Sequence, residues 1–337
     1  MTGYAELDPG LVLEALDAVN LRGDGRLLQL NSYENRVFQV FLEDGDVVVA
    51  KFYRPGRWSD AQILEEHAFA LELADAEVPV IAPRVLQAAA DAPQAVQLAG
   101  QPPTLATLGA GDQPHRFGVS PRSTGRAPEL EDPLVMEWLG RFLGRLHAVG
   151  ARSRFLHRRT LDVATFGTAA RQRLLDGRFV PEPQDVLWAD ASARALALAQ
   201  AAFDALPQAR QLRLHGDCHP GNILWRDEGP HVVDLDDACN GPAVQDLWML
   251  LSGDRPTMAM QLEWLLEGYE QFMPFDRREL TLIEPLRTLR MIHHSAWIAE
   301  RWNDPAFPAA FPWFGTAAYW QQQTQQLREQ IETMQEG

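Results

Sequence analysis

The chain has 337 residues, of which 46% are hydrophobic and 23% charged, a composition that suits two globular domains and excludes a mainly disordered protein. Its formal net charge of −16 argues against binding to nucleic acids or anionic membranes. Two cysteines exclude a disulfide scaffold, and neither a signal peptide nor a membrane span is visible in the sequence. We therefore expect a cytoplasmic, monomeric enzyme or binding protein.

The first part of the chain is predicted to be small and rich in β-structure. A short helix is expected over about residues 1–26, then a β-hairpin from residues 36–41 and 46–53. A helix over residues 59–76 follows, with Ser59 as its N-cap. Residues 78–85 resemble a loop entering a strand, and residues 87–131 show no regular pattern, with a hinge near residues 119–126.

The second part is predicted to be mostly helical. Residues 132–150 have the spacing of a helix whose apolar face carries Trp138, Phe142, Leu143 and Leu146. More helices are expected up to residue 206 and again over residues 243–336, with a segment of loops and strands at 212–238 between them. The fold class is therefore α/β (α+β), with a small β-rich lobe over residues 1–121 and a larger helical lobe over 122–337.

Lys51 is the only lysine in the sequence, so the other 29 of the 30 basic residues are arginines. A GC-rich genome explains most of this bias, but not why one lysine remains. Lysine carries a compact charge on a flexible stem, which the broad planar guanidinium of arginine does not replace. We interpret Lys51 as a functional residue.

The sharpest motif lies in residues 214–225, Leu-His-Gly-Asp-Cys-His-Pro-Gly-Asn-Ile-Leu-Trp. Asp217 follows His215 by two positions and precedes Asn222 by five, the spacing of the catalytic loop of protein kinases. In such a loop the aspartate accepts or orients the proton of an attacking hydroxyl, and the asparagine binds a metal ion beside the triphosphate. For His215 we favour a buried side chain that braces the loop over one that transfers protons.

Two further elements complete a kinase-like pattern. Asp234 ends a short apolar run, as does the carboxylate that holds Mg²⁺ in this kind of site, with Asp236 as the reserve candidate. Lys51 ends a predicted strand, where a lysine pairs with phosphates and with a glutamate of the next helix. We choose Glu66 for that glutamate because of its helical spacing to the apolar Ala70, and leave Glu65 open.

Other chemistries find less support. The acidic run at residues 234–237, taken alone, also fits a solvated turn. A zinc site at His215, Cys218 and His219 lacks a second closely spaced pair of ligands. There is no Walker A loop, no G-x-G-x-x-G, no H-E-x-x-H and no G-x-S-x-G motif.

On these residues the chain resembles the kinase-like phosphotransferases that include aminoglycoside, choline and homoserine kinases. More closely, it resembles the bacterial stress-response kinase A family of Ser/Thr protein kinases. This resemblance covers nearly the whole chain, is weakest between about residues 87 and 131, and is carried by residues 30–39, 51–55, 62–67, 214–225, 233–238, 240–250, 283–287 and 302–308.

The resemblance implies a two-lobed kinase that depends on ATP and Mg²⁺, with its active site in the cleft between the lobes. It implies Asp217 as catalytic base, Asn222 and Asp234 as metal ligands, Lys51 as a phosphate contact and Ser32 against the nucleotide. Asp246 is implied to anchor the backbone of the catalytic loop, although a carboxylate at a helix N-terminus fits it nearly as well.

The implied reaction is phosphorylation of Ser/Thr hydroxyls of proteins in a bacterial stress response, with autophosphorylation included. The alternatives are a small-molecule hydroxyl kinase and a non-catalytic nucleotide-binding scaffold. On the substrate side, the C-terminal region offers Arg287, Arg290, His293 and His294. Arg287 and Arg290 share a face at helical spacing, which suits an acidic substrate or a phosphate, or an ordinary solvated helix face.

The pattern departs from ordinary protein kinases in two respects. The glycine-rich loop is replaced by Asn-Ser-Tyr-Glu-Asn at residues 31–35, where backbone amides or the Ser32 hydroxyl can meet phosphate. No D-F-G or A-P-E motif is present, and eleven residues lie between Asp234 and Asp246, too few for an activation loop. The sequence therefore predicts a kinase that needs no activating phosphorylation.

Overall fold

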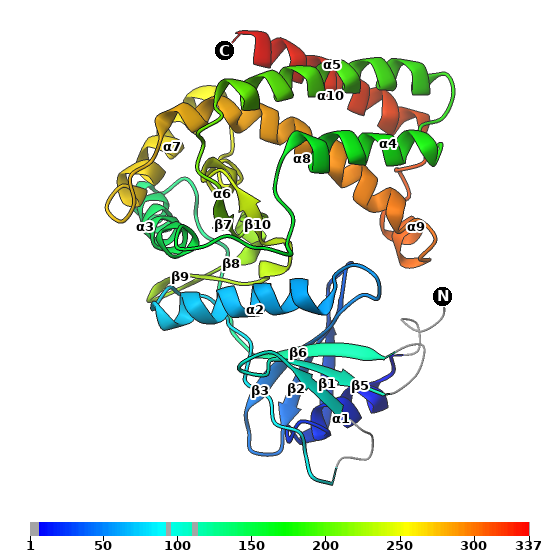
Figure 1. Ribbon diagram of the computed structural model, residues 1–337, viewed down its shortest axis with the longest axis vertical. Helices are drawn as coiled ribbons and strands as arrows, with labels where there is room; N and C mark the ends of the chain where they lie inside the picture. The colour runs from blue at the N-terminus through cyan, green and yellow to red at the C-terminus, as the bar shows by residue number, and fades with distance from the viewer. Residues whose placement is uncertain (1–6, 92–95, 110–113, 337) are drawn as a thin grey trace. The chain divides into compact units, whose positions relative to one another are not determined.

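The structure is a computed structural model that describes residues 7–91, 96–109 and 114–336. The chain forms two units, coloured by residue number in Figure 1. Unit 1 comprises Met1–Glu129, Leu156–Arg158 and His219–Ala238, and unit 2 comprises Leu130–Phe155, Arg159–Cys218 and Cys239–Gly337. This division differs from the single cut expected after residue 121, because two later segments return to unit 1.

Unit 1 is built on a six-stranded antiparallel sheet with the strand order β1-β2-β3-β6-β5-β4. Its strands are β1 (Gly23–Leu30), β2 (Arg36–Leu42), β3 (Val47–Phe52), β4 (Val96–Ala99), β5 (Leu105–Leu108) and β6 (His115–Pro121). The expected hairpin is confirmed as β2 and β3. The expectation of a helix up to residue 26 is wrong over β1, and three strands lie in the region predicted to be irregular.

Strands of this sheet were missed for two physical reasons. β1 and β4 are the two edges of the sheet, and β1 is mostly exposed, so neither shows the alternation of polar and apolar residues that marks a half-buried strand. β6 pairs with β3, far away in sequence, so that Lys51 is opposite Gly118. Such long-range pairing leaves no local signal.

Two helices cover this sheet (Figure 1). α1 (Pro9–Asp17) buries Val12 and Leu16 in a cluster with sheet residues that include Phe117. α2 (Asp60–Asp75) begins at Ser59, whose hydroxyl accepts from the backbone N–H of Gln62 in a full capping box. The predicted N-cap is therefore confirmed, and such caps stabilise a helix by about 1 kcal/mol.

The third segment of unit 1 carries a small hairpin, β8 (Ile223–Arg226) and β9 (Gly229–Val232), between the 3₁₀ turns η2 (Pro220–Asn222) and η3 (Leu235–Asp237). Val232 forms a parallel bridge with Val80. That isolated bridge is what residues 78–85 contribute in place of a regular strand. It ties the hairpin to the part of unit 1 that precedes it in sequence.

Unit 2 is mainly helical, as predicted. Its elements are α3 (Pro133–Gly150), η1 (Val163–Thr168), α4 (Ala169–Asp176), α5 (Gln184–Ala205), β7 (Leu212–Leu214), β10 (Cys239–Gly241), α6 (Val244–Trp248), α7 (Arg255–Tyr269), η4 (Arg277–Leu282), α8 (Ile283–Glu300), α9 (Ala306–Ala310) and α10 (Ala317–Glu336). α10 packs along α5 (Figure 1). In α3, Phe142, Leu143 and Leu146 are buried as expected.

The prediction for Trp138 is wrong, because its side chain is 42% exposed. The guanidinium of Arg141 lies 6.0 Å from the centre of the Trp138 ring. A guanidinium over the face of a tryptophan ring is attracted to it, which favours an exposed position of this ring. None of the described helices is both long and apolar enough to span a membrane.

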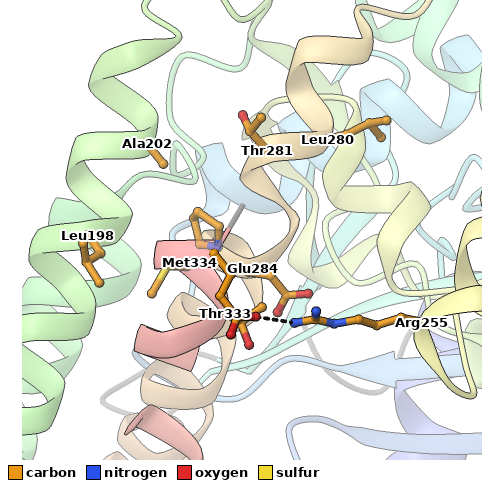
Figure 2. Close-up of a pocket in the computed structure, with 10 residues that line it drawn as sticks. Leu198, Ala202, Arg255, Leu280, Thr281, Glu284, Thr333 and Met334 are labelled. Carbon is orange, nitrogen blue, oxygen red and sulfur yellow. Dashed lines mark ion pairs between the residues drawn. The ribbon is translucent and has the colours of Figure 1, made fainter. Parts of the chain in front are cut away.

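Unit 2 also has an open pocket of about 410 Å³ (Figure 2). Its walls come from α5, η4, α8 and the end of α10, and include Leu198, Leu280 and Met334. Arg255 and Glu336 form an ion pair of 3.7 Å at this pocket. None of the residues predicted to be catalytic or to bind a nucleotide lines it.

Candidate active site

Lys51 lies near the end of β3 in unit 1 and points at two carboxylates. Its Nζ is 2.7 Å from Oδ1 of Asp234 and 3.9 Å from Oδ1 of Asp236. Burial lowers the pKa of Lys51, but the two carboxylates outweigh that effect and hold the pKa well above its ordinary value. The ammonium is therefore charged, as a phosphate contact requires.

Asp234 lies where β9 ends and has a left-handed backbone, with φ of 61° and ψ of 64°. This conformation is uncommon for residues other than glycine and is often found at functional sites. The backbone N–H of Val233 donates to the carbonyl of Asn222 over 3.0 Å, which places the Asn222 backbone beside the segment that carries Asp234. The two predicted metal ligands thus come from adjoining backbone.

The reserve candidate, Asp236, has different surroundings. Its side chain is 5% exposed, whereas that of Asp234 is 52% exposed. Asp236 accepts from Nδ2 of Asn35 over 3.1 Å and also binds Arg57. Burial raises the pKa of Asp236, but Arg57 and Lys51 more than compensate, so the pKa lies below its ordinary value. Asp236 is an internal anchor, and Asp234 is the carboxylate open to a ligand.

The residues present fit a bound Mg²⁺ ion. Magnesium prefers oxygen ligands and is commonly held by one or two protein side chains together with substrate phosphates. Asp234 supplies an exposed carboxylate and Asn222 a side-chain amide, from adjoining segments. Among the described residues, no group of three or more His, Cys, Asp and Glu side chains is arranged to hold a metal ion.

The two glutamates of α2 have separate surroundings. Glu65 accepts three backbone N–H groups, from Leu156, His157 and Arg158, at 2.6, 2.8 and 2.9 Å. Glu66 is buried, which raises its pKa to about 7 against the attraction of Lys51. Within the described residues, no ion pair joins Glu66 to Lys51 at 4 Å or less, since Lys51 pairs with Asp234 and Asp236.

Ser32 lies in the loop that stands in place of a glycine-rich loop, and its Oγ accepts from the backbone N–H of Asn35 at 3.3 Å. Asn35 in turn binds Asp236 and accepts from the backbone N–H of Arg54 at 3.1 Å. Arg57 pairs with Asp236 and, at 2.7 Å, with Asp237. Sequence reasoning missed Arg54 and Arg57, although the Arg-Pro-Gly-Arg run after Lys51 is a visible signal.

Asp217 belongs to unit 2 and follows β7. The carboxylate of Asp246 accepts the backbone N–H groups of His215 and Gly216, each at 2.8 Å, which confirms Asp246 as the anchor of this loop. His215 is fully buried, and its Nδ1 accepts the backbone N–H of Asp217 at 3.3 Å. The expected bracing role of His215 is confirmed by this bond.

One contact of Asp217 was not anticipated. Nη1 of Arg290, on α8, lies 2.5 Å from its Oδ1. The helical spacing placed Arg290 on a face with Arg287, but a spacing of 73 residues from Asp217 carries no local signal. Arg287 lies over the ring of Trp248 and is 3.4 Å from Glu284.

The residues predicted for the active site are divided between the two units. Unit 1 pairs a partly buried lysine with an exposed aspartate that adjoins Asn222, residue types that bind phosphates and a divalent cation in kinases. Unit 2 holds Asp217 on a loop braced by Asp246, and the chain passes directly from this loop to Asn222. A β-sheet N-terminal lobe and a helical C-terminal lobe that carry these groups define a kinase-like phosphotransferase.

Comparison with known proteins agrees with this class. The model of the phosphotransferase enzyme family matches residues 26–283. Stress response kinase A of Escherichia coli K12 is 44% identical over 99% of this chain and 95% of its own. The Salmonella typhimurium protein named serine/threonine protein kinase RdoA is 43% identical over the same shares. The chain belongs to the stress response kinase A family within the phosphotransferase enzyme family, and it is a kinase.

Solved structures confirm the fold. The amicoumacin kinase hAmiN, in complex with AMP-PNP, Ca²⁺ and Ami, aligns over 98% of this chain and 94% of its own, with a TM-score of 0.71 and 18% identity. A microcompartment-associated aminopropanol kinase aligns over 97% and 98%, with a TM-score of 0.71 and 17% identity. At this identity the similarity concerns the fold.

Proposed function

We propose that this kinase transfers the γ-phosphoryl group of ATP to Ser and Thr hydroxyls of proteins, itself included, with Mg²⁺ as the metal ion. The observation that supports this most is the ion pair of Lys51 and Asp234 beside Asn222, together with the braced Asp217. The name of the Salmonella relative supports protein as the acceptor. Stress as the setting rests on the names of the E. coli relatives.

In the proposed nucleotide site, the ammonium of Lys51 leaves Asp234 and binds the α- and β-phosphates of ATP. Asp234 and Asn222 would hold Mg²⁺, which would neutralise charge on the phosphates. The loop at residues 31–35 places the Ser32 hydroxyl and backbone amides against the nucleotide. Asp234 and Asp236 keep the ammonium protonated, and the buried Glu66 adds a smaller effect in the same direction.

In the proposed transfer, Asp217 accepts the proton of the acceptor hydroxyl through a carboxylate oxygen. The hydroxyl oxygen forms a bond to the γ-phosphorus as the bond from that phosphorus to the bridging oxygen breaks. The products are the phosphorylated side chain and ADP. The hydrogen bonds that the side chains of Asp246 and His215 accept from backbone N–H groups hold the loop of Asp217 in place during this step.

The second candidate is a small-molecule hydroxyl kinase, because the structural neighbours include an aminopropanol kinase and an amicoumacin kinase. The catalytic residues serve either acceptor, so the acceptor itself must be tested. We would measure transfer of radiolabelled γ-phosphate to a generic protein substrate, to the enzyme itself and to a panel of small alcohols, with Asp217→Ala as the blank.

Label on protein Ser or Thr that is absent with Asp217→Ala supports the proposal. Label on a small alcohol alone overturns the protein acceptor and leaves the catalytic residues standing. Absence of label in every arm, with ATP still bound, favours a nucleotide-binding scaffold.

A further inference from the structure

The carboxylate proposed to accept the proton is engaged by a cation of its own unit. Arg290 Nη1 lies 2.5 Å from Oδ1 of Asp217, and the two side chains are 44% and 24% exposed. Ion pairs that are open to water contribute little net stability, so a competing partner displaces one side at small cost. Arg290 is therefore a cation held at the proposed acceptor position and available for exchange.

The neighbours of this pair on α8 do not offset the charge of Arg290. His294, one turn further along the helix, is an imidazole and supplies no negative charge; desolvation and Arg290 lower its pKa, while Asp217 acts in the opposite direction. His293 contacts Nη1 of Arg159 at 3.3 Å, a second guanidinium. Arg287 precedes Arg290 by one turn and has Glu284 as its acidic partner. On this helix, the group that pairs with Asp217 is the cation Arg290.

The ring of Trp297, further along α8, is already in contact with other groups of the protein. Trp297 stacks on His294 at 5.7 Å, Phe307 packs edge-on at 5.1 Å, and the guanidinium of Arg301 lies 5.3 Å from the ring. A ring that binds a cationic ligand needs a free face for it. Trp297 thus carries an arginine of this chain, which argues against a quaternary ammonium acceptor at this position.

We propose that Arg290 is an acceptor-specificity residue that selects Ser/Thr peptides with Asp or Glu beside the acceptor. A peptide carboxylate takes the guanidinium of Arg290 and thereby leaves the carboxylate of Asp217 to accept the hydroxyl proton. One ion pair is exchanged for another, so the peptide carboxylate is bound while Asp217 becomes available. This inference rests on the proposed protein-kinase function and adds its substrate class.

The test separates binding from transfer. Two fluorescent peptides differ only in the residues that flank the acceptor, Asp and Glu in one and Asn and Gln in the other, and Ala replaces the acceptor Ser. Their affinities for the full chain, with Mg²⁺ and a non-hydrolysable ATP analogue, are measured by fluorescence anisotropy. The same pair with Ser in place of Ala reports kcat and KM.

The variants are Arg290→Gln, which removes the charge, Arg290→Lys, which keeps it, and Arg173→Gln as matched control. Arg173 is also on unit 2, is likewise 44% exposed and pairs with Glu300 at 2.9 Å. We expect the wild type and Arg173→Gln to bind the acidic peptide about tenfold more tightly than the neutral one. Arg290→Gln should lose this preference, mainly in KM, and Arg290→Lys should keep part of it.

Equal affinity of the wild type for both peptides, or an undiminished preference in Arg290→Gln, overturns the inference. A preference that depends on Arg290 without any phosphoryl transfer leaves the charge selectivity standing and refutes the protein-kinase function. The failures of the two proposals are thus distinguishable.

Discussion

Asp234 and Asp236 lie two residues apart, yet the structure gives their carboxylates different surroundings. Asp234 is half exposed and pairs with Lys51, whereas Asp236 is buried against Arg57 and Asn35. Asp234 is the metal ligand predicted from the sequence because it ends an apolar run. The burial that distinguishes the two carboxylates is not visible in the sequence. Similarly, Glu65 is committed to backbone amides of residues 156–158, which leaves Glu66 as the glutamate near Lys51.

At the residue scale, the first prediction concerns Asp217→Ala. Loss of a general base lowers turnover by roughly 10²–10⁴-fold, and we expect a decrease of that size in kcat. ATP affinity should remain near that of the wild type, because the phosphate contacts lie on unit 1. The measurement is the rate of phosphoryl transfer beside a nucleotide-binding titration, and a variant with wild-type kcat would remove Asp217 from the reaction.

The second prediction separates the two aspartates of residues 234–236. Asp234→Ala should weaken binding of Mg²⁺-ATP and leave the free energy of unfolding nearly unchanged, because its carboxylate is exposed. Asp236→Ala leaves Arg57 buried without this partner, and loss of one member of a buried ion pair costs roughly 3–5 kcal/mol. Titration of nucleotide and urea unfolding test both. Normal Mg²⁺-ATP binding by Asp234→Ala, with loss in Asp236→Ala, would exchange their roles.

At the element scale, α3 and α7 approach each other so closely that glycine is required on both. A Cβ at Gly140 would lie 1.9 Å from the carbonyl oxygen of Leu265, and one at Gly268 would lie 2.0 Å from that of Glu137. Backbone atoms cannot move aside to make room for a Cβ, whereas the end of a flexible side chain can. The crossing of these helices therefore depends on two residues that have poor helix propensity.

The third prediction follows from this crossing. Gly140→Ala should destabilise the protein by roughly 1–3 kcal/mol or more through overpacking, although alanine favours a helix by about 1 kcal/mol over glycine. Gly315→Ala is the control, since a Cβ there meets no atom within 4 Å. Chemical denaturation of both variants is the measurement, and equal stability of the two would show that the helices separate at no cost.

The fourth prediction concerns the stretch between Asp234 and Asp246. It is occupied by η3, β10 and the start of α6, so little of it is free to form an activation loop. We expect full kinase activity in enzyme that carries no phosphate. Mass spectrometry of the purified protein, paired with an activity assay, decides this. Inactive, unphosphorylated enzyme that an upstream kinase activates would contradict it.

At the scale of the whole molecule, stability should respond to pH through Glu279. Burial, helped by the nearby Asp276, raises the pKa of this carboxyl to about 7 from 4.5. The bond that its Oε2 accepts from the backbone N–H of Val244 at 3.1 Å, and the charge of Arg210, act in the opposite direction. The folded state therefore binds more protons than the unfolded state between these values. The stability from this group is present below pH 4.5 and is lost as the pH rises through 7.

The fifth prediction is that Glu279→Gln flattens this dependence. Relative to the wild type, the variant should gain stability between pH 5 and 8, by roughly 3 kcal/mol at the limit. The exposed Glu329→Gln serves as the control. Urea unfolding at several pH values gives the slopes, and parallel curves for the wild type and Glu279→Gln would exclude Glu279 as the source.

The spacing of Lys51, Asp217, Asn222 and Asp234 was readable along the chain, because kinase chemistry needs these residue types at short, ordered intervals. The Ser59 cap and the helical second part were readable for a similar reason, since caps and helical periodicity are local patterns. Contacts between distant residues gave no such pattern. The pairing of β3 with β6, the choice between Glu65 and Glu66, and the approach of Arg290 to Asp217 arise when packing brings together groups that are 65 to 93 positions apart in the chain.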